Sequence, residues 1–204
     1  MEGSIKTLEP KILAGYCLTM SFAENQTFRL WNTFMPRLKE ISGRIGDELY
    51  NLQLYPENFF KSFNPAQSFE KWAAVEVSNA DNLPDGLTPF YLEGGLYAVF
   101  HYKGSGEDAP EIYRKILLEW VPANGFEIDT RPHFELMGSK YQRGNPESEE
   151  EIWIPVRLAK YLIKGGIHQV PERSFYLAAG LQHNCFINAR KSPFAFKLFK
   201  IFCT

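Results

Sequence analysis

The sequence predicts an α+β fold made of two tandem copies of one strand-helix-strand-strand unit. The clearer copy runs from Tyr91 to Val156, where an apolar strand, an amphipathic helix and two further strands follow one another. Three landmarks of that copy also occur earlier in the chain at one common offset. The landmark pairs are Tyr16 and Tyr97 (97 − 16 = 81), Glu70 and Glu151 (151 − 70 = 81), and Trp72 and Trp153 (153 − 72 = 81). This shared offset and the shared element order indicate a duplication.

The composition is that of a folded protein and argues against several functional classes. The 204 residues are 45% hydrophobic, which is enough for a substantial core. A net charge of −2 gives no general attraction to nucleic acid or to anionic membranes. The sequence has no signal peptide and no apolar run long enough to span a bilayer, so we expect a cytoplasmic location. The cysteines Cys17, Cys185 and Cys203 are too widely spaced for a disulfide scaffold or a zinc site, and we expect no cofactor or metal.

We expect the first half to span residues 10–79, after a short leader of residues 1–9. Its first strand lies between Pro10 and Phe22, where apolar residues alternate in places. Its helix begins after Asn25, a favourable N-cap. Pro36 should break this helix into two pieces, because proline has no backbone N–H to donate. Two strands follow, over residues 48–56 and 68–79, and a linker of residues 80–89 joins the halves.

We expect the second half to span residues 90–158. Glycines bound its first strand, and Asp108 is expected to cap the helix, which ends near Pro122. In its last strand, Glu151 and Trp153 share one face, and the alternate Ile and Val residues share the other; the first half repeats this pattern between residues 70 and 77. Because β-branched residues pack well against an amphipathic helix, we assign the Ile/Val face to the helices. The face with glutamate and tryptophan then looks outward or into a cleft.

Several stretches carry a resemblance to a known family. They are GGLYAVFHYKG, HFEL and EEEIWIPV in the second half, and LWNTFMPRLKEI and SFEKWAAVEV in the first. Together with the duplicated element order, they resemble the GyrI-like small-molecule-binding domain, also called the effector-binding domain of AraC-type regulators. The resemblance covers residues 10–158, and the first half is similar to a stand-alone branch of the family.

This resemblance implies both a fold and a site. The fold is one continuous antiparallel sheet made by two modules about a pseudo-twofold axis, with helices on one side and a ligand groove near the axis. The family binds amphipathic compounds, often cationic or planar aromatic, in an aromatic pocket with a buried glutamate. That glutamate corresponds to Glu135. Met137 replaces the tyrosine of the family pattern, which puts the usual hydroxyl of the pocket wall in question.

Glu135 also stands out without the resemblance, because a carboxylate among apolar neighbours is costly to bury unless it is paired. Its two interpretations are a counter-charge for a cationic ligand and an ion pair with a nearby Arg or Lys. The Glu-x-Trp pairs, Glu70 with Trp72 and Glu151 with Trp153, also suit a cation, through charge and cation-π attraction. Core packing is the alternative for the tryptophans.

Tyr16 and Tyr97 complete the set of expected ligand-binding residues. If they occupy matching positions in the two copies, they line the groove on both sides of the pseudo-axis; cross-strand packing is the alternative. The full set is Glu135, Trp72, Trp153, Tyr16, Tyr97, Glu70, Glu151 and Met137.

The leading functional hypothesis is a stand-alone protein that binds small molecules for sensing or sequestration. Direct DNA binding is not expected, because the leader is too short for a helix-turn-helix and the duplicated unit contains none. One alternative is a ring-opening hydrolase that uses Glu135 or Glu151 as a general base. Another is a protein partner, as in gyrase inhibition by relatives. The oligomeric state stays open.

The segment of residues 159–204 does not fit the duplicated unit. From Tyr161 to the end it has six Lys or Arg residues and one acid, and it closes with the basic aromatic stretch SPFAFKLFKIFCT. Such a stretch suits a helix that binds a membrane surface or a partner. The simpler interpretation is an appended segment without a selected function, which need not be well ordered.

Overall fold

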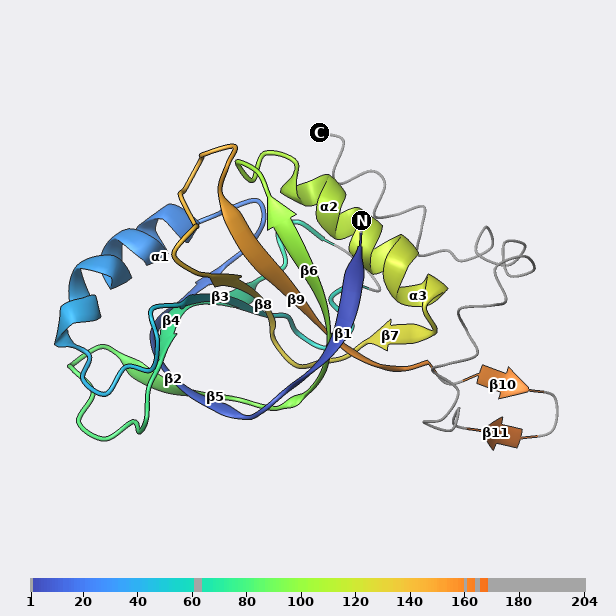
Figure 1. Cartoon of the computed structure of the whole chain (residues 1–204), viewed down its shortest axis with the longest axis horizontal. Helices are drawn as coiled ribbons and strands as arrows, with labels where there is room; N and C mark the ends of the chain where they lie inside the picture. Colours follow the sequence, from blue (N-terminus) through green and yellow to red (C-terminus); the bar gives the residue numbers. More distant parts are fainter. Residues whose placement is uncertain (1, 61–63, 160, 164–165, 169–204) are drawn as a thin grey trace.

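The computed structural model describes residues 2–60, 64–159, 161–163 and 166–168. It confirms an α+β fold in which one antiparallel sheet of nine strands carries the helices (Figure 1). The sheet order is β1-β6-β9-β8-β3-β4-β2-β5, with β7 paired to β9; a separate pair is formed by β10 (Tyr161–Ile163) and β11 (Gly166–His168). The strands of the main sheet are β1 (Gly3–Leu8), β2 (Lys11–Met20), β3 (Leu49–Leu54), β4 (Phe69–Glu76), β5 (Thr88–Leu92), β6 (Gly95–Lys103), β7 (Phe126–Ile128), β8 (His133–Met137) and β9 (Glu149–Leu158).

The sheet order confirms the duplication. Read outward from its middle, the sheet runs β3-β4-β2 in one direction and β8-β9-β6 in the other, so the three strands of each half occur in the same order. The halves meet where β3 pairs antiparallel with β8; in this ladder Asn51 lies opposite Glu135, and Leu52 lies opposite Phe134. The pseudo-twofold axis therefore passes through the middle of the sheet.

The register of the strands corrects the equivalence of Tyr16 and Tyr97. Trp72 lies opposite Cys17, and Trp153 lies opposite Val99, so the tryptophans differ by 153 − 72 = 81 while their partners differ by 99 − 17 = 82. The two tyrosines, 81 apart, are therefore one residue out of step. Because a one-residue slip turns a side chain to the other face, Tyr16 packs on the helix side and Tyr97 on the opposite side.

The expectation that residues 1–9 are only a leader was wrong. Gly3–Leu8 form the edge strand β1, which pairs antiparallel with β6 over its whole length. The edge strand β5 pairs in the same way with β2. Each edge strand thus precedes one half in the chain and pairs with the other half. The sequence hid β1 because an edge strand with mostly exposed residues shows little apolar alternation.

The first helical segment and its break at Pro36 were predicted correctly, but its N-cap is Gln26 and not Asn25. Helix α1 (Thr27–Phe34) passes into a 3-10 segment, η1 (Met35–Glu40), at Pro36. The side-chain oxygen of Asn25 accepts a hydrogen bond from the backbone N–H of Thr27 (2.9 Å), so it satisfies a free donor at the start of the helix. The buried Leu30 and Phe34 anchor α1 on β2 and β4.

The second helical segment was predicted in extent and in the position of its N-cap, Asp108, but not in the capping hydrogen bond. It consists of α2 (Ala109–Lys115), a wide π-helical turn η2 (Ile116–Trp120) and α3 (Val121–Ala123). Asp108 does not cap it through its side chain. Its carboxylate instead accepts a hydrogen bond from the Tyr102 hydroxyl, because the neighbouring strand brings this stronger donor within reach.

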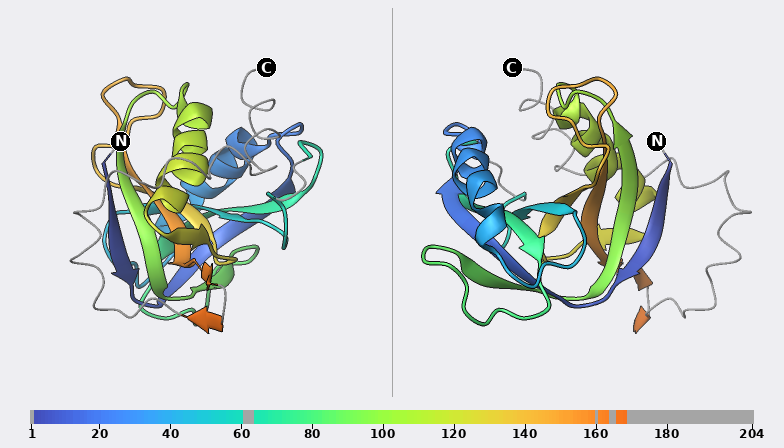
Figure 2. Two further views of the ribbon diagram at one scale, coloured as in Figure 1. Left: turned by 90° about the vertical axis from the view of Figure 1, so that its right-hand side faces the viewer. Right: turned by 60° about the vertical axis from the view of Figure 1, so that its left-hand side comes forward.

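Both helices pack on the same face of the sheet (Figure 2). Ala73, Val75 and Val77 of the first half contact α1, and the Ile/Val face of β9 contacts α2, which confirms the assignment of these faces to the helices. The opposite face has its own core. It includes Tyr97, Phe134 and Trp153 together with residues of the edge strands.

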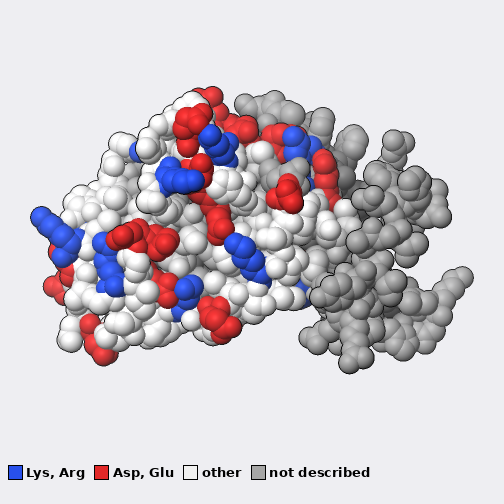
Figure 3. All heavy atoms as spheres, viewed as in Figure 1, with Lys and Arg blue, Asp and Glu red and all other residues white. Residues whose placement is uncertain are grey.

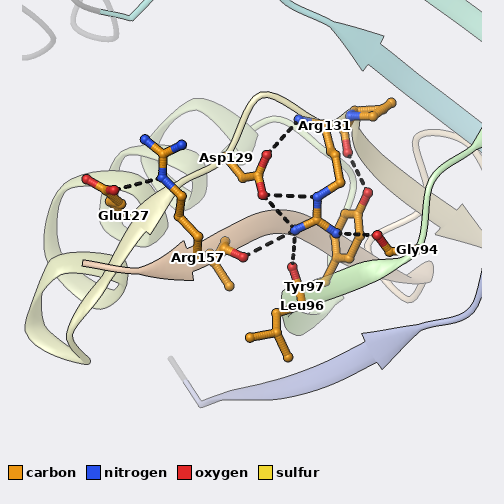
Figure 4. Close-up of polar contacts among 9 residues, drawn as sticks. Gly94, Leu96, Tyr97, Glu127, Asp129, Arg131 and Arg157 are labelled. Carbon is orange, nitrogen blue, oxygen red and sulfur yellow. Dashed lines mark hydrogen bonds and ion pairs between the residues drawn. The ribbon is translucent and has the colours of Figure 1, made fainter. Parts of the chain in front are cut away.

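Arg131 ties together the strand ends in the second half (Figure 4). Its guanidinium donates to the backbone oxygens of Gly94 (3.1 Å), Leu96 (2.8 Å) and Val156 (3.2 Å). It also forms an ion pair with Asp129 (2.9 Å) and lies over the ring of Tyr97, 4.7 Å from the centroid. One largely buried side chain therefore satisfies backbone groups of two neighbouring segments, residues 94–96 and strand β9.

The surface carries charges of both signs. Figure 3 shows acidic and basic side chains interspersed on the face seen in Figure 1. Exposed ion pairs among the described residues include Arg157 with Glu127 (2.7 Å) and Arg114 with Glu111 (2.7 Å). In the described part of the chain, no helix is long and apolar enough to cross a membrane. The prediction for the basic aromatic end of the chain lies outside the described residues.

Candidate functional site

A cluster of polar side chains lies on the helix side of the sheet, at its centre. Side chains alternate along β3 and β8, so Asn51, Gln53 and Glu135 share the face that carries α1 and α2. Tyr113 reaches the cluster from α2. We call this set, with the charged and phenolic groups coupled to it, the Glu135 cluster. Its members are Asn51, Gln53, Tyr55, Lys71, Tyr113, Glu135, Tyr141 and Glu150.

Glu135 is held by neutral donors. Its Oε2 accepts hydrogen bonds from Asn51 Nδ2 (2.7 Å) and Gln53 Nε2 (2.8 Å), and its Oε1 accepts one from the Tyr113 hydroxyl. None of the ion pairs among the described residues involves Glu135. Its negative charge is therefore hydrogen-bonded but not neutralised by direct contact with a cation.

The pseudo-symmetry makes this carboxylate unique. Leu52 and Phe134 occupy equivalent positions in the two halves, at an offset of 134 − 52 = 82. At the same offset, Gln53 is the residue of the first half that is equivalent to Glu135 (135 − 53 = 82). One half thus supplies the charge, and the equivalent position of the other half supplies an amide that donates to it. The site is asymmetric although the scaffold is nearly symmetric.

The electrostatics of the cluster are dominated by burial. The pKa of Glu150 is raised to about 7, first by burial and then by the charge of Glu135, while Lys71 opposes both. Burial lowers the pKa of Lys71, and the two glutamates oppose that shift. Burial also raises the pKa of Tyr113 and Tyr55, as does the Glu135 charge, so both phenols stay neutral near pH 7.

Binding of a cation at this cluster should depend on pH through Glu150. Because its pKa is about 7, Glu150 ionises as the pH rises from 6 to 8, and its charge is then the second negative charge of the cluster, beside that of Glu135. We expect the affinity for a monovalent lipophilic cation to rise about fivefold over this range, from Coulomb attraction across a few ångströms of partly shielded space. Calorimetric titration of wild type and Glu150→Gln measures it. An equally steep pH dependence in the variant would contradict this role.

His133 lies two residues before Glu135 and is 3% exposed. Its ring stacks on Phe60 (centroids 5.6 Å apart) and meets Tyr55 edge to face (5.2 Å). Burial lowers its pKa to about 3, with Asp129 opposing the shift. The imidazole is therefore neutral in the folded protein, and it forms part of the wall beside the Glu135 cluster.

Acid should destabilise the fold through His133. The pKa is about 6.5 in the unfolded chain and about 3 in the folded one, so the unfolded state takes up the proton first. Its contribution to stability is complete above about pH 6.5 and is lost as the pH falls, by about 2 kcal/mol between pH 7 and 5. Urea unfolding of wild type and His133→Phe at both values checks this. The pH effect should be smaller in the variant; an equal effect would assign it to other groups.

The Glu-x-Trp pairs lie on the opposite face from Glu135. Trp153 is 8% exposed, stacks on Phe134 (centroids 5.3 Å apart) and donates to Glu151 (2.9 Å). A cation does occupy this pair, but it is Lys6 of β1, which contacts Glu151 (2.9 Å) and lies 5.3 Å from the Trp153 ring centroid. Glu135 and Glu151 therefore do not face one site, as a hydrolase that uses both would require.

The first half repeats this arrangement more loosely. Trp72 belongs to the same core as Trp153, packs against Phe90 of β5 (centroids 5.0 Å apart) and donates to Glu70 (3.2 Å). Tyr97 is fully buried in that core and donates to the backbone oxygen of Pro132 (3.3 Å). The structure brings none of these side chains to the Glu135 cluster.

Met137 and Tyr16 lie on the same side of the sheet as Glu135. Met137 is buried, two residues along β8 from Glu135, and Tyr16 packs against the core below α1. A hydroxyl does reach Glu135, but from Tyr113 of the helix and not from the position of Met137. Tyr113 is not among the ligand-binding residues that the sequence predicts.

Sequence reasoning also missed Lys71 and Glu150. Lys71 is the charged residue on the otherwise apolar face of its strand, and that interruption was the available signal. Glu150 belongs to the acidic stretch ESEE, a pattern that is typical of a solvated loop. Among the described residues, no group of three or more His, Cys, Asp or Glu side chains is placed to hold a metal ion.

Comparisons with known proteins identify the family. The family model described as "GyrI-like small molecule binding domain" matches residues 1–157. The transcriptional regulator BrlR of Pseudomonas aeruginosa is 28% identical over 131 residues, which cover 63% of this chain and 45% of BrlR. The chain thus spans less than half of that relative's length.

Solved structures share the fold. SAV2435 bound to tetraphenylphosphonium superposes with a TM-score of 0.58 at 15% identity, over 77% of this chain and 94% of SAV2435. The C-terminal domain of EcmrR superposes with a TM-score of 0.57 at 15% identity, over 78% of this chain and 98% of that domain. At these identities the likeness concerns the fold.

Proposed function

This chain belongs to the family of GyrI-like small-molecule-binding domains, and on that basis we propose that it binds amphipathic cations at the Glu135 cluster. The observation that carries the proposal is the bonding of Glu135. A half-buried carboxylate that accepts three hydrogen bonds from neutral donors keeps its charge available to a ligand. In a site partly shielded from water, that charge attracts a cation more strongly than a surface carboxylate does.

The surroundings of Glu135 suit a compound with a flat apolar body. Tyr113 and Tyr55 supply neutral aromatic rings, and Met137 adds a flexible apolar side chain that adapts to a ligand's shape. Helices α1 and α2 stand on either side of the central strands that carry the cluster (Figure 2). We assign Trp72, Trp153 and Tyr97 to the opposite core, and Glu70 and Glu151 to its rim.

The relatives support the ligand class and the role. SAV2435, which shares the fold, binds tetraphenylphosphonium, a lipophilic cation. BrlR is a transcriptional regulator, and a domain of this family within a regulator is suited to sensing a compound. We propose that this chain senses or sequesters such compounds. The hydrolase alternative has no support in the positions of Glu135 and Glu151.

A pair of ions with one shape and opposite charges tests the proposal. Tetraphenylphosphonium and tetraphenylborate have nearly the same size and apolar surface, so their difference in affinity reports the sign of charge that the site prefers. In calorimetric titrations of the full chain, we expect the cation to bind and the anion to bind at least tenfold more weakly. Equal affinities, or tighter binding of the anion, would overturn the proposal.

A further inference from the structure

Two buried oxygen atoms beside Glu135 have no hydrogen-bond partner. They are the side-chain oxygens of Asn51 and Gln53, and Gln53 is only 4% exposed. A buried acceptor without a partner loses its hydrogen bond with water and gains nothing in return. Such atoms are uncommon in folded proteins, so two of them next to one carboxylate need an explanation.

The orientation of both amides is fixed by Glu135. Each NH₂ group donates to its Oε2, at 2.7 Å from Asn51 and 2.8 Å from Gln53. The reverse orientation would place an amide oxygen against the carboxylate oxygen, which is repulsive. Since the oxygen and nitrogen of one amide share a carbon atom, each unpaired oxygen lies beside a hydrogen bond to Glu135. The side chains of Asn51, Gln53 and Glu135 thus combine one carboxylate with two amide oxygens that have no hydrogen-bond partner.

From this acceptor set we infer that the preferred ligand carries its positive charge on nitrogen with N–H groups, as in a protonated primary amine or an amidinium, attached to an apolar body. The inference rests on the proposed function and narrows its ligand class. A quaternary ammonium or a phosphonium satisfies the charge of Glu135 but offers nothing to the amide oxygens. A head group with N–H donors satisfies both, because charge and hydrogen bonds then come from the same atoms.

Two naphthalene derivatives provide the test. Naphthalen-2-ylmethylammonium and its N,N,N-trimethyl analogue have the same ring and the same charge, but only the first has N–H donors. Calorimetric titration of the full chain should give at least tenfold tighter binding of the first. In Gln53→Met, which removes one unpaired oxygen while keeping the side-chain length, the ratio of the two affinities should fall at least threefold.

The outcomes separate this inference from the proposed function. A ratio near one, or a ratio unchanged in Gln53→Met, would overturn the preference for N–H donors. If both probes still lose affinity in Glu135→Gln, the proposed cation binding at this site is kept and only the preference for N–H donors is dropped. Binding of both probes that is unaffected by Glu135→Gln would overturn the inference and the proposed site together.

Discussion

In the variant Glu135→Gln, the affinity for tetraphenylphosphonium is expected to fall by about ten- to a hundredfold. Glutamine has the same size, and its one side-chain oxygen can still accept from Asn51 and Gln53 while its NH₂ group faces the Tyr113 hydroxyl, so the main loss is the negative charge. In a site partly shielded from water, removing that charge withdraws most of the attraction for the cation. The measurement is calorimetric titration at pH 8, where Glu150 is mainly ionised.

The matched control is Glu151→Gln. Glu151 lies on the neighbouring strand but on the opposite face, where it contacts Lys6 and Trp153. Its removal should leave the affinity within about twofold, since its ion pair is partly exposed and far from the proposed ligand. If Glu151→Gln weakens binding as much as Glu135→Gln does, the effect is one of net charge and the site is misplaced.

The second large effect is expected for stability, in Arg131→Ala. The substitution removes the guanidinium that donates to the backbone oxygens of Gly94, Leu96 and Val156, and it leaves the carboxylate of Asp129 with backbone donors but no cation. Breaking a largely buried charged network of this kind costs about 3 kcal/mol. The free energy of unfolding in urea should fall by that amount, and the melting temperature by about 6–12 °C.

Arg157→Ala is the control for Arg131. Arg157 lies on the same part of the sheet and forms one ion pair, with Glu127, but its side chain is 57% exposed (Figure 4). An exposed pair contributes about 0–1 kcal/mol, so this variant should unfold close to wild type. Equal losses for the two variants would show that Arg131 acts as an ordinary surface charge.

Local patterns in the sequence were enough to predict most of the elements. The alternation in the last strand of each half identified the faces that meet the helices, and Pro36 marked the end of α1. Strand β1 was missed because its own residues show no clear strand pattern. It is a strand because it pairs with β6. The slip between Tyr16 and Tyr97 was missed because register depends on hydrogen bonds between strands and not on residue identity.

Of the residues of the proposed site, the sequence indicated Glu135 and Met137. Glu135 stood out as a charge in an apolar strand, and the family pattern pointed to the same position. Its partners come from distant parts of the chain: Gln53 is 82 residues away and Asn51 84. Residue spacing does not predict these hydrogen bonds, because they form where strands of the two halves pair. The two tryptophans were predicted to bind the ligand because an alternating strand pattern defines two faces but does not show which face holds the ligand.

The most direct test of the account is to locate a bound cation by the anomalous scattering of its central atom. Tetraphenylarsonium has the shape of tetraphenylphosphonium, and its arsenic atom marks its position in a crystal of the complex. The account predicts one arsenic peak on the helix side of the sheet, above β3 and β8 and next to Glu135. A peak on the opposite face, beside Trp72 or Trp153, would contradict it.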